Sequence, residues 1–222
     1  SMLKIHNNSN SFLHTLLGSS YLDTSEKFAD KQTIQNITSS YKAEEYFDVL
    51  TTIGYNFASE GAHQFGILNG FSFFAISAGA IASNKNVQLK GYDLFEDYQY
   101  NSSSFHAVNK TKQNLSSCSN TELIKARVLC NDYKFTGVLH NKFNIIDLSN
   151  CGEIVQNVLK TFVESPSNAI MFEGGSKARD EVTWMHNYNR KPIFEVLEEM
   201  SECFEINVLD IFPSLTIVRK IE

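Results

Sequence analysis

From about residue 62 onward, short apolar runs alternate with helical stretches, and this alternation constrains the fold more than any other feature. The runs that predict strands are residues 62–67, 87–94, 143–148, 169–172, 204–210 and 215–220. Helical patterns occupy residues 71–83, part of 104–132, 152–164, 176–187 and 192–203. Strands that alternate with helices of this length require right-handed crossovers. The sequence therefore predicts an α/β class, with a doubly wound, mostly parallel sheet covered on both faces.

The two ends of the chain depart from this alternation. Residues 211–214 contain Pro213 and predict a tight turn, so the last two strands are expected to form an antiparallel hairpin at the sheet end. Residues 1–60 are expected to be a helical lead-in, followed by one α/β domain over residues 61–222. Within the lead-in, Ser40 is a candidate cap for a helix whose apolar residues recur at helical spacing. Those residues are Tyr46, Phe47, Leu50, Ile53 and Phe57.

Composition restricts the partners. The formal net charge is −6, and the 19 Lys and Arg residues are scattered, so a nucleic-acid surface is not expected. The apolar run at residues 70–82 is too short to cross a membrane, and the first residues lack the layout of a signal peptide. The four cysteines show no metal-ligand spacing and are expected to be reduced thiols, which favours a cytoplasmic protein. They are Cys118, Cys130, Cys151 and Cys203.

A glycine turn follows the first predicted strand of the domain. It contains Gly66 and Gly70 and leads directly into a helix. Glycines here allow close approach of a ligand to the backbone, and the helix start offers free N–H groups. Asp93 ends the next strand, where an acid in such a sheet accepts hydrogen bonds from ribose hydroxyls. The structural alternatives are that the glycines serve only the packing of strand against helix, and that Asp93 is a solvated acid in a turn.

Two further strands also end in acids. Asp147 follows the third predicted strand of the domain, and Glu173 ends the fourth, just before Gly174 and Gly175. Ligands bind at this carboxyl edge in open α/β folds, so acids here favour a cationic or hydroxyl-rich ligand. Ser176 is suited to capping the helix that follows.

This layout resembles the class I S-adenosylmethionine-dependent methyltransferases. The likeness is to small members such as the cephalosporin-hydroxylase-like group and related methyltransferases of natural products or cell-surface sugars. It covers about residues 62–220 and rests on residues 66–72, 91–93, 147 and 172–175. It implies a seven-stranded Rossmann-like sheet with a reversed last strand, and a methyltransferase that acts on a small-molecule hydroxyl.

The resemblance also implies a set of cofactor-binding residues. The glycines would approach the methionine part and the ribose of S-adenosylmethionine, Asp93 would hold the ribose hydroxyls, and Asp147 or Leu148 would meet the adenine. The full set is Gln64, Gly66, Asn69, Gly70, Ser72, Asp93, Asp147 and Leu148. Gln64 is a departure, because families of this type usually have an acid there.

Methyl transfer is an in-line displacement that needs alignment of the reactants, with a base when the acceptor is a hydroxyl. Candidate bases are Glu173, His106 and His186. Glu96 and Asp97 together with Glu173 could hold a divalent cation, but a solvated acidic turn explains Glu96 and Asp97 equally well. We therefore expect no resident metal.

Two rival functions and one question of assembly stay open. A non-catalytic adenosine-binding module of the same fold is consistent with the neutral Gln64. A nicotinamide-dependent oxidoreductase is the other rival, although such enzymes more often carry a G-x-G-x-x-G turn and an all-parallel edge. The lead-in at residues 1–60 either covers the substrate pocket or forms a homodimer interface.

Overall fold

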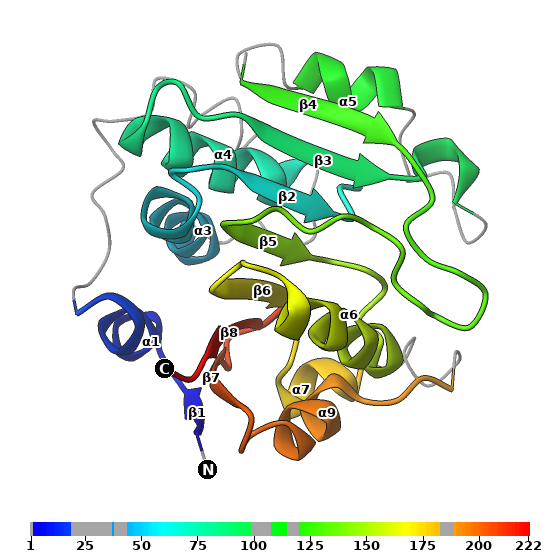
Figure 1. The fold of residues 1–222 in the computed structure, drawn as a ribbon. Coiled ribbons are helices and arrows are strands. Elements are labelled where there is room, and N and C mark those ends of the chain that lie inside the picture. The colour runs from blue at the N-terminus through cyan, green and yellow to red at the C-terminus, as the bar shows by residue number, and fades with distance from the viewer. Residues whose placement is uncertain (1, 19–36, 38–43, 99–107, 115–119, 183–188) are drawn as a thin grey trace. The chain divides into compact units, whose positions relative to one another are not determined.

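The computed structural model describes residues 2–18, 37, 44–98, 108–114, 120–182 and 189–222. It divides into two compact units, which we call the inner unit (residues 21–128) and the outer unit (residues 1–20 and 129–222). In both units parallel strands alternate with helices (Figure 1). The predicted α/β class is confirmed.

The inner unit contains three strands that pair in the order β2-β3-β4, all parallel. Figure 1 shows α4 behind these strands. The bounds are α3 Glu44–Phe57, β2 Ala62–Phe65, α4 Phe71–Ser83, β3 Leu89–Asp93, the 3-10 helix η1 Phe95–Asp97, α5 Val108–Asn114 and β4 Thr121–Lys125.

Helices α3 and α4 cross at two glycines. A Cβ atom at Gly79 would lie 2.0 Å from the carbonyl oxygen of Thr51, and one at Gly54 would lie 2.0 Å from that of Ile76. Only glycine permits so close an approach of two helix backbones. Four of the five predicted stripe residues of α3 are buried, namely Tyr46, Phe47, Leu50 and Ile53. This packing fixes α4, whose first turn borders the glycine turn.

The outer unit contains five strands in the order β1-β7-β8-β6-β5. β1 pairs parallel with β7, and β5 pairs parallel with β6, whereas β8 runs antiparallel to both of its neighbours. The bounds are β1 Leu3–His6, α1 Ser9–Leu17, β5 Phe143–Ile146, α6 Gly152–Glu164, β6 Ala169–Glu173, α7 Lys177–Asp180, α9 Ile193–Glu199, β7 Phe204–Leu209 and β8 Leu215–Lys220.

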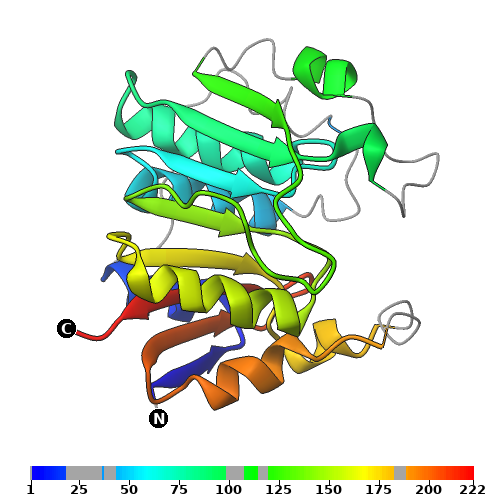
Figure 2. The ribbon, with the colours of Figure 1, turned by 45° about the vertical axis from the view of Figure 1, so that its right-hand side comes forward.

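Helices cover both faces of this outer sheet (Figure 2). On one face, α6 packs beside α9, and the ring of Phe162 lies 5.8 Å from that of Phe204 on β7. On the other face, α1 packs against β7, where Asn207 bonds His6 of β1. Side chains at even and odd positions of β7 therefore meet different helix layers, as alternation along a strand requires.

The structure corrects the predicted strand count. The described residues contain eight strands rather than seven, and two of them, β1 and β4, were not expected. β1 lies inside the predicted helical lead-in and pairs beyond β7, so the confirmed antiparallel hairpin does not end the sheet. β4 was missed because it is short and mostly polar, with only Leu123 buried.

Several other expectations have mixed outcomes. α4 and α6 match their predicted bounds. Of the helix expected over residues 176–187, the described part, residues 176–182, is helical at Lys177–Asp180. Residues 183–187 and Ser40 lie outside the described residues. The boundary between a lead-in and an α/β domain at residue 60 stays a prediction. No helix among the described residues has the length and apolarity needed to span a membrane.

Candidate functional site

The carboxylate of Asp93 is bonded to the glycine turn. Its Oδ2 accepts hydrogen bonds from the backbone N–H of Ile67 at 2.7 Å and of Leu68 at 3.0 Å. Its Oδ1 accepts one from the N–H of Phe95 at 2.7 Å. β2 and β3 pair parallel, so their carboxyl ends lie together and bring the acid and the turn within reach. The two features that the sequence singled out therefore converge.

The turn itself depends on its glycines. Gly66 and Gly70 have φ angles of 93° and 92°, a region that favours glycine. A Cβ atom at Gly70 would also lie 2.6 Å from the ring of Phe74. Between them, Leu68 takes φ 53° and leaves its side chain 45% exposed. An exposed apolar residue held in a strained conformation marks this turn as a surface shaped for contact.

Gln64 is fully buried beneath the turn. Its Nε2 donates to the carbonyl oxygen of Gly66 at 3.1 Å and to Ser72 Oγ at 3.0 Å, which ties the end of β2 to the first turn of α4. Its Oε1 has no hydrogen-bond partner among the described residues. Gln64 thus offers a neutral acceptor. Asn69, in the same turn, is also buried.

The acids that follow Asp93 are paired with a cation. Glu96 and Asp97 on η1 both form ion pairs with Lys125 of β4, the second at 3.2 Å. The hydrogen bond from Lys125, helped by one from the N–H of Val108, lowers the pKa of Glu96 to about 2. Lys125 thus offsets one of the two negative charges that would be offered to a divalent cation. No cluster of three or more metal-ligating side chains occurs among the described residues.

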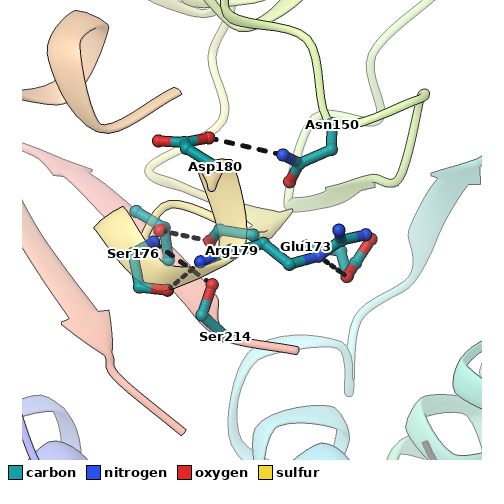
Figure 3. Close-up of polar contacts among 8 residues, drawn as sticks. Asn150, Glu173, Ser176, Arg179, Asp180 and Ser214 are labelled. Carbon is teal, nitrogen blue, oxygen red and sulfur yellow. Dashed lines mark hydrogen bonds and ion pairs between the residues drawn. The ribbon is translucent and has the colours of Figure 1, made fainter. Parts of the chain in front are cut away.

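In the outer unit, Glu173 ends β6 as a buried acid. Nε of Arg179 on α7 lies 3.3 Å from its Oε1, and both side chains are less than one-tenth exposed. Figure 3 shows the guanidinium turned toward the carboxylate. The guanidinium also lies over the ring of Phe212 at 5.7 Å. A buried carboxylate needs such a partner, because an unpaired charge is costly to desolvate.

The turn after Glu173 is locked to the β7–β8 hairpin. The N–H of Gly174 donates to the carbonyl oxygen of Ser214 at 2.8 Å, and Thr216 Oγ1 donates to the carbonyl oxygen of Gly174 at 2.8 Å. A Cβ atom at Gly175 would lie 2.0 Å from Thr216 Oγ1. The hairpin therefore sets the direction in which the chain leaves β6.

Ser176 and Asp180 have structural roles. Ser176 Oγ accepts from the N–H of Arg179 at 3.1 Å, as predicted for a helix cap (Figure 3). Asp180 accepts from the N–H groups of Ile193 and Phe194, at 3.1 and 2.9 Å, and so caps α9. Burial raises the pKa of Asp180, against these hydrogen bonds that lower it.

Of the remaining expected site residues, two are among the described residues and two are not. Asp147 and Leu148 follow β5 and are half-buried, next to Ser149 and Asn150, whose φ angles are 60° and 46°. Their contact with an adenine stays a prediction. His106 and His186 lie outside the described residues.

Sequence reasoning missed two partners at these sites. Arg179 was passed over because its spacing from Glu173 matches no motif, although an Arg in the turn of helix after a strand-end acid is a usable signal. Lys125 was missed together with β4, the strand that carries it. Both cations pair with acids that the sequence analysis had considered as a candidate base or as metal ligands.

Comparison with known proteins identifies solved structures that share this fold. No family model matches the chain, and no curated protein matches its sequence. The structure of cofactor-bound Rv0187 from MTB is 11% identical with a TM-score of 0.59, over 97% of this chain and 98% of that one. Precorrin-6y C5,15-methyltransferase from Geobacter metallireducens GS-15 is 11% identical with a TM-score of 0.51, over 83% and 95%. The chain shares its fold with a methyltransferase.

The Asp93 contacts predict a local stability effect. Asp93→Ala removes the acceptor of three N–H groups, and we expect the free energy of unfolding to fall by about 2–4 kcal/mol. Urea denaturation measures this change. The matched control is Asp97→Ala, an exposed acid on η1, which should change stability little. Equal effects of the two substitutions would contradict the role assigned to Asp93.

The buried ion pair generates a second prediction. Arg179→Met leaves Glu173 buried without its partner and should lower the free energy of unfolding by about 3–5 kcal/mol. Lys177→Met is the control, because Lys177 is exposed on the same short helix and its ammonium lies over the ring of Phe194, 4.9 Å from the ring centroid. Its cost should stay below about 1 kcal/mol. Thermal unfolding of the two variants, measured side by side, gives both costs. An Arg179→Met cost no larger than that of Lys177→Met would refute the stabilising role of the buried ion pair.

Proposed function

We propose that the protein is an S-adenosylmethionine-dependent methyltransferase whose acceptor is a hydroxyl of a small molecule, a sugar or a natural product, as in the cephalosporin-hydroxylase-like group. The observation that carries the proposal is the carboxylate of Asp93, held against the glycine turn at 2.7 Å from the N–H of Ile67. The shared fold supports the same conclusion at the level of architecture.

The residues of the inner unit fit this cofactor. Three amide donors occupy three of the roughly four lone-pair directions of the Asp93 carboxylate, which leaves Oδ1 able to accept from a ribose hydroxyl. α4 begins at Phe71, and its N-cap residue Gly70 provides no side-chain cap, so the first-turn N–H groups suit a carboxylate. The orphaned Oε1 of Gln64 suits an ammonium donor. Bound there, S-adenosylmethionine would supply a methyl group on a sulfonium.

The acceptor side is assigned to Glu173. Its carboxylate is buried and held by Arg179, so its orientation does not depend on solvent. A fixed carboxylate can take the proton of an acceptor hydroxyl, and the guanidinium keeps it in one position while it does so. We propose His106 and His186 as alternative bases, and Asp147 and Leu148 as the residues that contact the adenine.

Composition supports the class of acceptor and the compartment that we propose. A net charge of −6 with scattered cations supports a small-molecule acceptor rather than a nucleic acid. The described cysteines Cys130, Cys151 and Cys203 are free thiols, which is consistent with the cytoplasm. A homodimer is the assembly we propose to test alongside the activity.

A binding module without turnover is the second candidate, and Gln64 favours it. A neutral amide contributes no countercharge to the amino group or the sulfonium of the cofactor. On this alternative the protein binds S-adenosylmethionine and its demethylated product with similar affinity and transfers nothing. Release of labelled S-adenosylhomocysteine in the presence of sugar and phenolic acceptors separates the two candidates.

Binding of the demethylated product tests the proposal directly. S-adenosylhomocysteine at 100 times its dissociation constant should stabilise the protein by about 2.7 kcal/mol, which raises the melting temperature by roughly 5–10 °C. Asp93→Asn should weaken binding about 10- to 100-fold, since it removes a charged acceptor. Asp97→Asn should bind like the wild type. No stabilisation of the wild type, or equal binding by both variants, would refute the cofactor site.

A further inference from the structure

A chain of polar side chains in the outer unit, outside the sites described above, joins β1, α1, β7 and β8. Ser11 Oγ lies 2.9 Å from His6 Nδ1, and His6 Nε2 lies 2.8 Å from Asn207 Oδ1. Asn207 Nδ2 donates to Glu205 Oε1 at 3.3 Å, and Glu205 in turn pairs with Arg219. The chain thus runs from an exposed hydroxyl to a fixed ion pair.

The order of donors and acceptors sets the tautomer of His6. The carboxylate of Glu205 only accepts, so the amide nitrogen of Asn207 faces it and the amide oxygen faces the imidazole. An amide oxygen also only accepts, so His6 Nε2 must carry a proton. In the neutral ring, Nδ1 then has a lone pair directed at the hydroxyl of Ser11. His6 is therefore oriented as a base toward Ser11.

The surroundings keep the imidazole in place and leave the hydroxyl accessible. His6 is 6% exposed and meets the ring of Phe12 edge-on, with 5.8 Å between the ring centroids. Ser11 is exposed in the first turn of α1. That turn contains no acidic residue. The neutral side chain of its N-cap residue Asn8 accepts a hydrogen bond from the N–H of Ser11, and the positive end of the helix dipole would favour an oxyanion that forms there.

From this arrangement we propose that Ser11 is a nucleophile activated by His6, with Asn207 as the residue that positions the base, and that the site accepts the acyl group of a small carboxylic ester. A serine, a base at hydrogen-bond distance and a third group that orients the base are the elements that nucleophilic catalysis requires. Asn207 acts only through His6.

The step balances without a further reactant. Ser11 Oγ forms a bond to the ester carbonyl carbon, and its proton passes to His6 Nδ1. The bond from that carbon to the alcohol oxygen breaks, and the proton moves from Nδ1 to the departing alkoxide. Water then attacks the acylated serine, gives one proton to Nδ1, and releases the acid as Ser11 regains its proton.

Diisopropyl fluorophosphate is the probe, because it forms an Oγ–P bond and loses fluoride at activated serines. Peptide mass spectrometry of the wild-type protein should show Ser11 labelled about 100-fold faster than Ser83, an exposed serine at the end of α4. Equal labelling of the two serines overturns the proposal. No cofactor is present in this assay, so its outcome does not depend on the proposed methyl transfer.

Variants separate activation from a purely structural chain of hydrogen bonds. His6→Gln should reduce labelling of Ser11 about 100-fold while Ser83 is labelled as in the wild type. Ser11→Ala should abolish the hydrolysis of p-nitrophenyl acetate by the protein. The Ser83→Ala control should hydrolyse it at the wild-type rate. A His6→Gln protein that folds and labels Ser11 at the wild-type rate would show that His6 is not the base.

Discussion

The hydrogen bonds that the glycine turn donates to the carboxylate of Asp93 are the interaction on which the inner unit's site depends. They join the carboxyl ends of two parallel strands, and they hold Ile67 and Leu68 in a turn that the glycines alone would leave free. The same carboxylate then starts η1 through the N–H of Phe95. A single acid thereby shapes the turn, ends a strand and retains capacity for a hydroxyl. Loss of the Asp93 carboxylate is therefore expected to lower both cofactor binding and local stability.

The outer unit uses a buried acid in a different way. Glu173 is compensated by Arg179, and the chain beyond it is directed by the hairpin through Ser214 and Thr216. The antiparallel strand β8 and the turn before it thus have a local role besides strand pairing, because Thr216 and Ser214 fix the glycine pair. Gln64 in the inner unit shows the complementary case, a buried amide whose nitrogen is fully used and whose oxygen has no partner among the described residues.

Much of this could be predicted from the sequence, and the physical reason is periodicity. α4 and α6 have strong apolar patterns with clear ends, so their bounds were predicted correctly, and the convergence of Asp93 with the turn followed from parallel pairing. β1 and β4 could not be predicted, because four- and five-residue strands with few buried positions have no distinct pattern. Lys125 pairs with its acids through a tertiary contact that spacing does not encode, whereas Arg179 follows Glu173 closely in the chain and was missed because the spacing matches no motif.

The most direct test of the central claim is a crystal structure of the protein grown with S-adenosylhomocysteine. A ribose hydroxyl is expected within hydrogen-bond distance of the Asp93 carboxylate, with the bonds from Ile67 and Leu68 to that carboxylate retained. A ligand bound elsewhere on the chain, or a ribose held without Asp93, would contradict it.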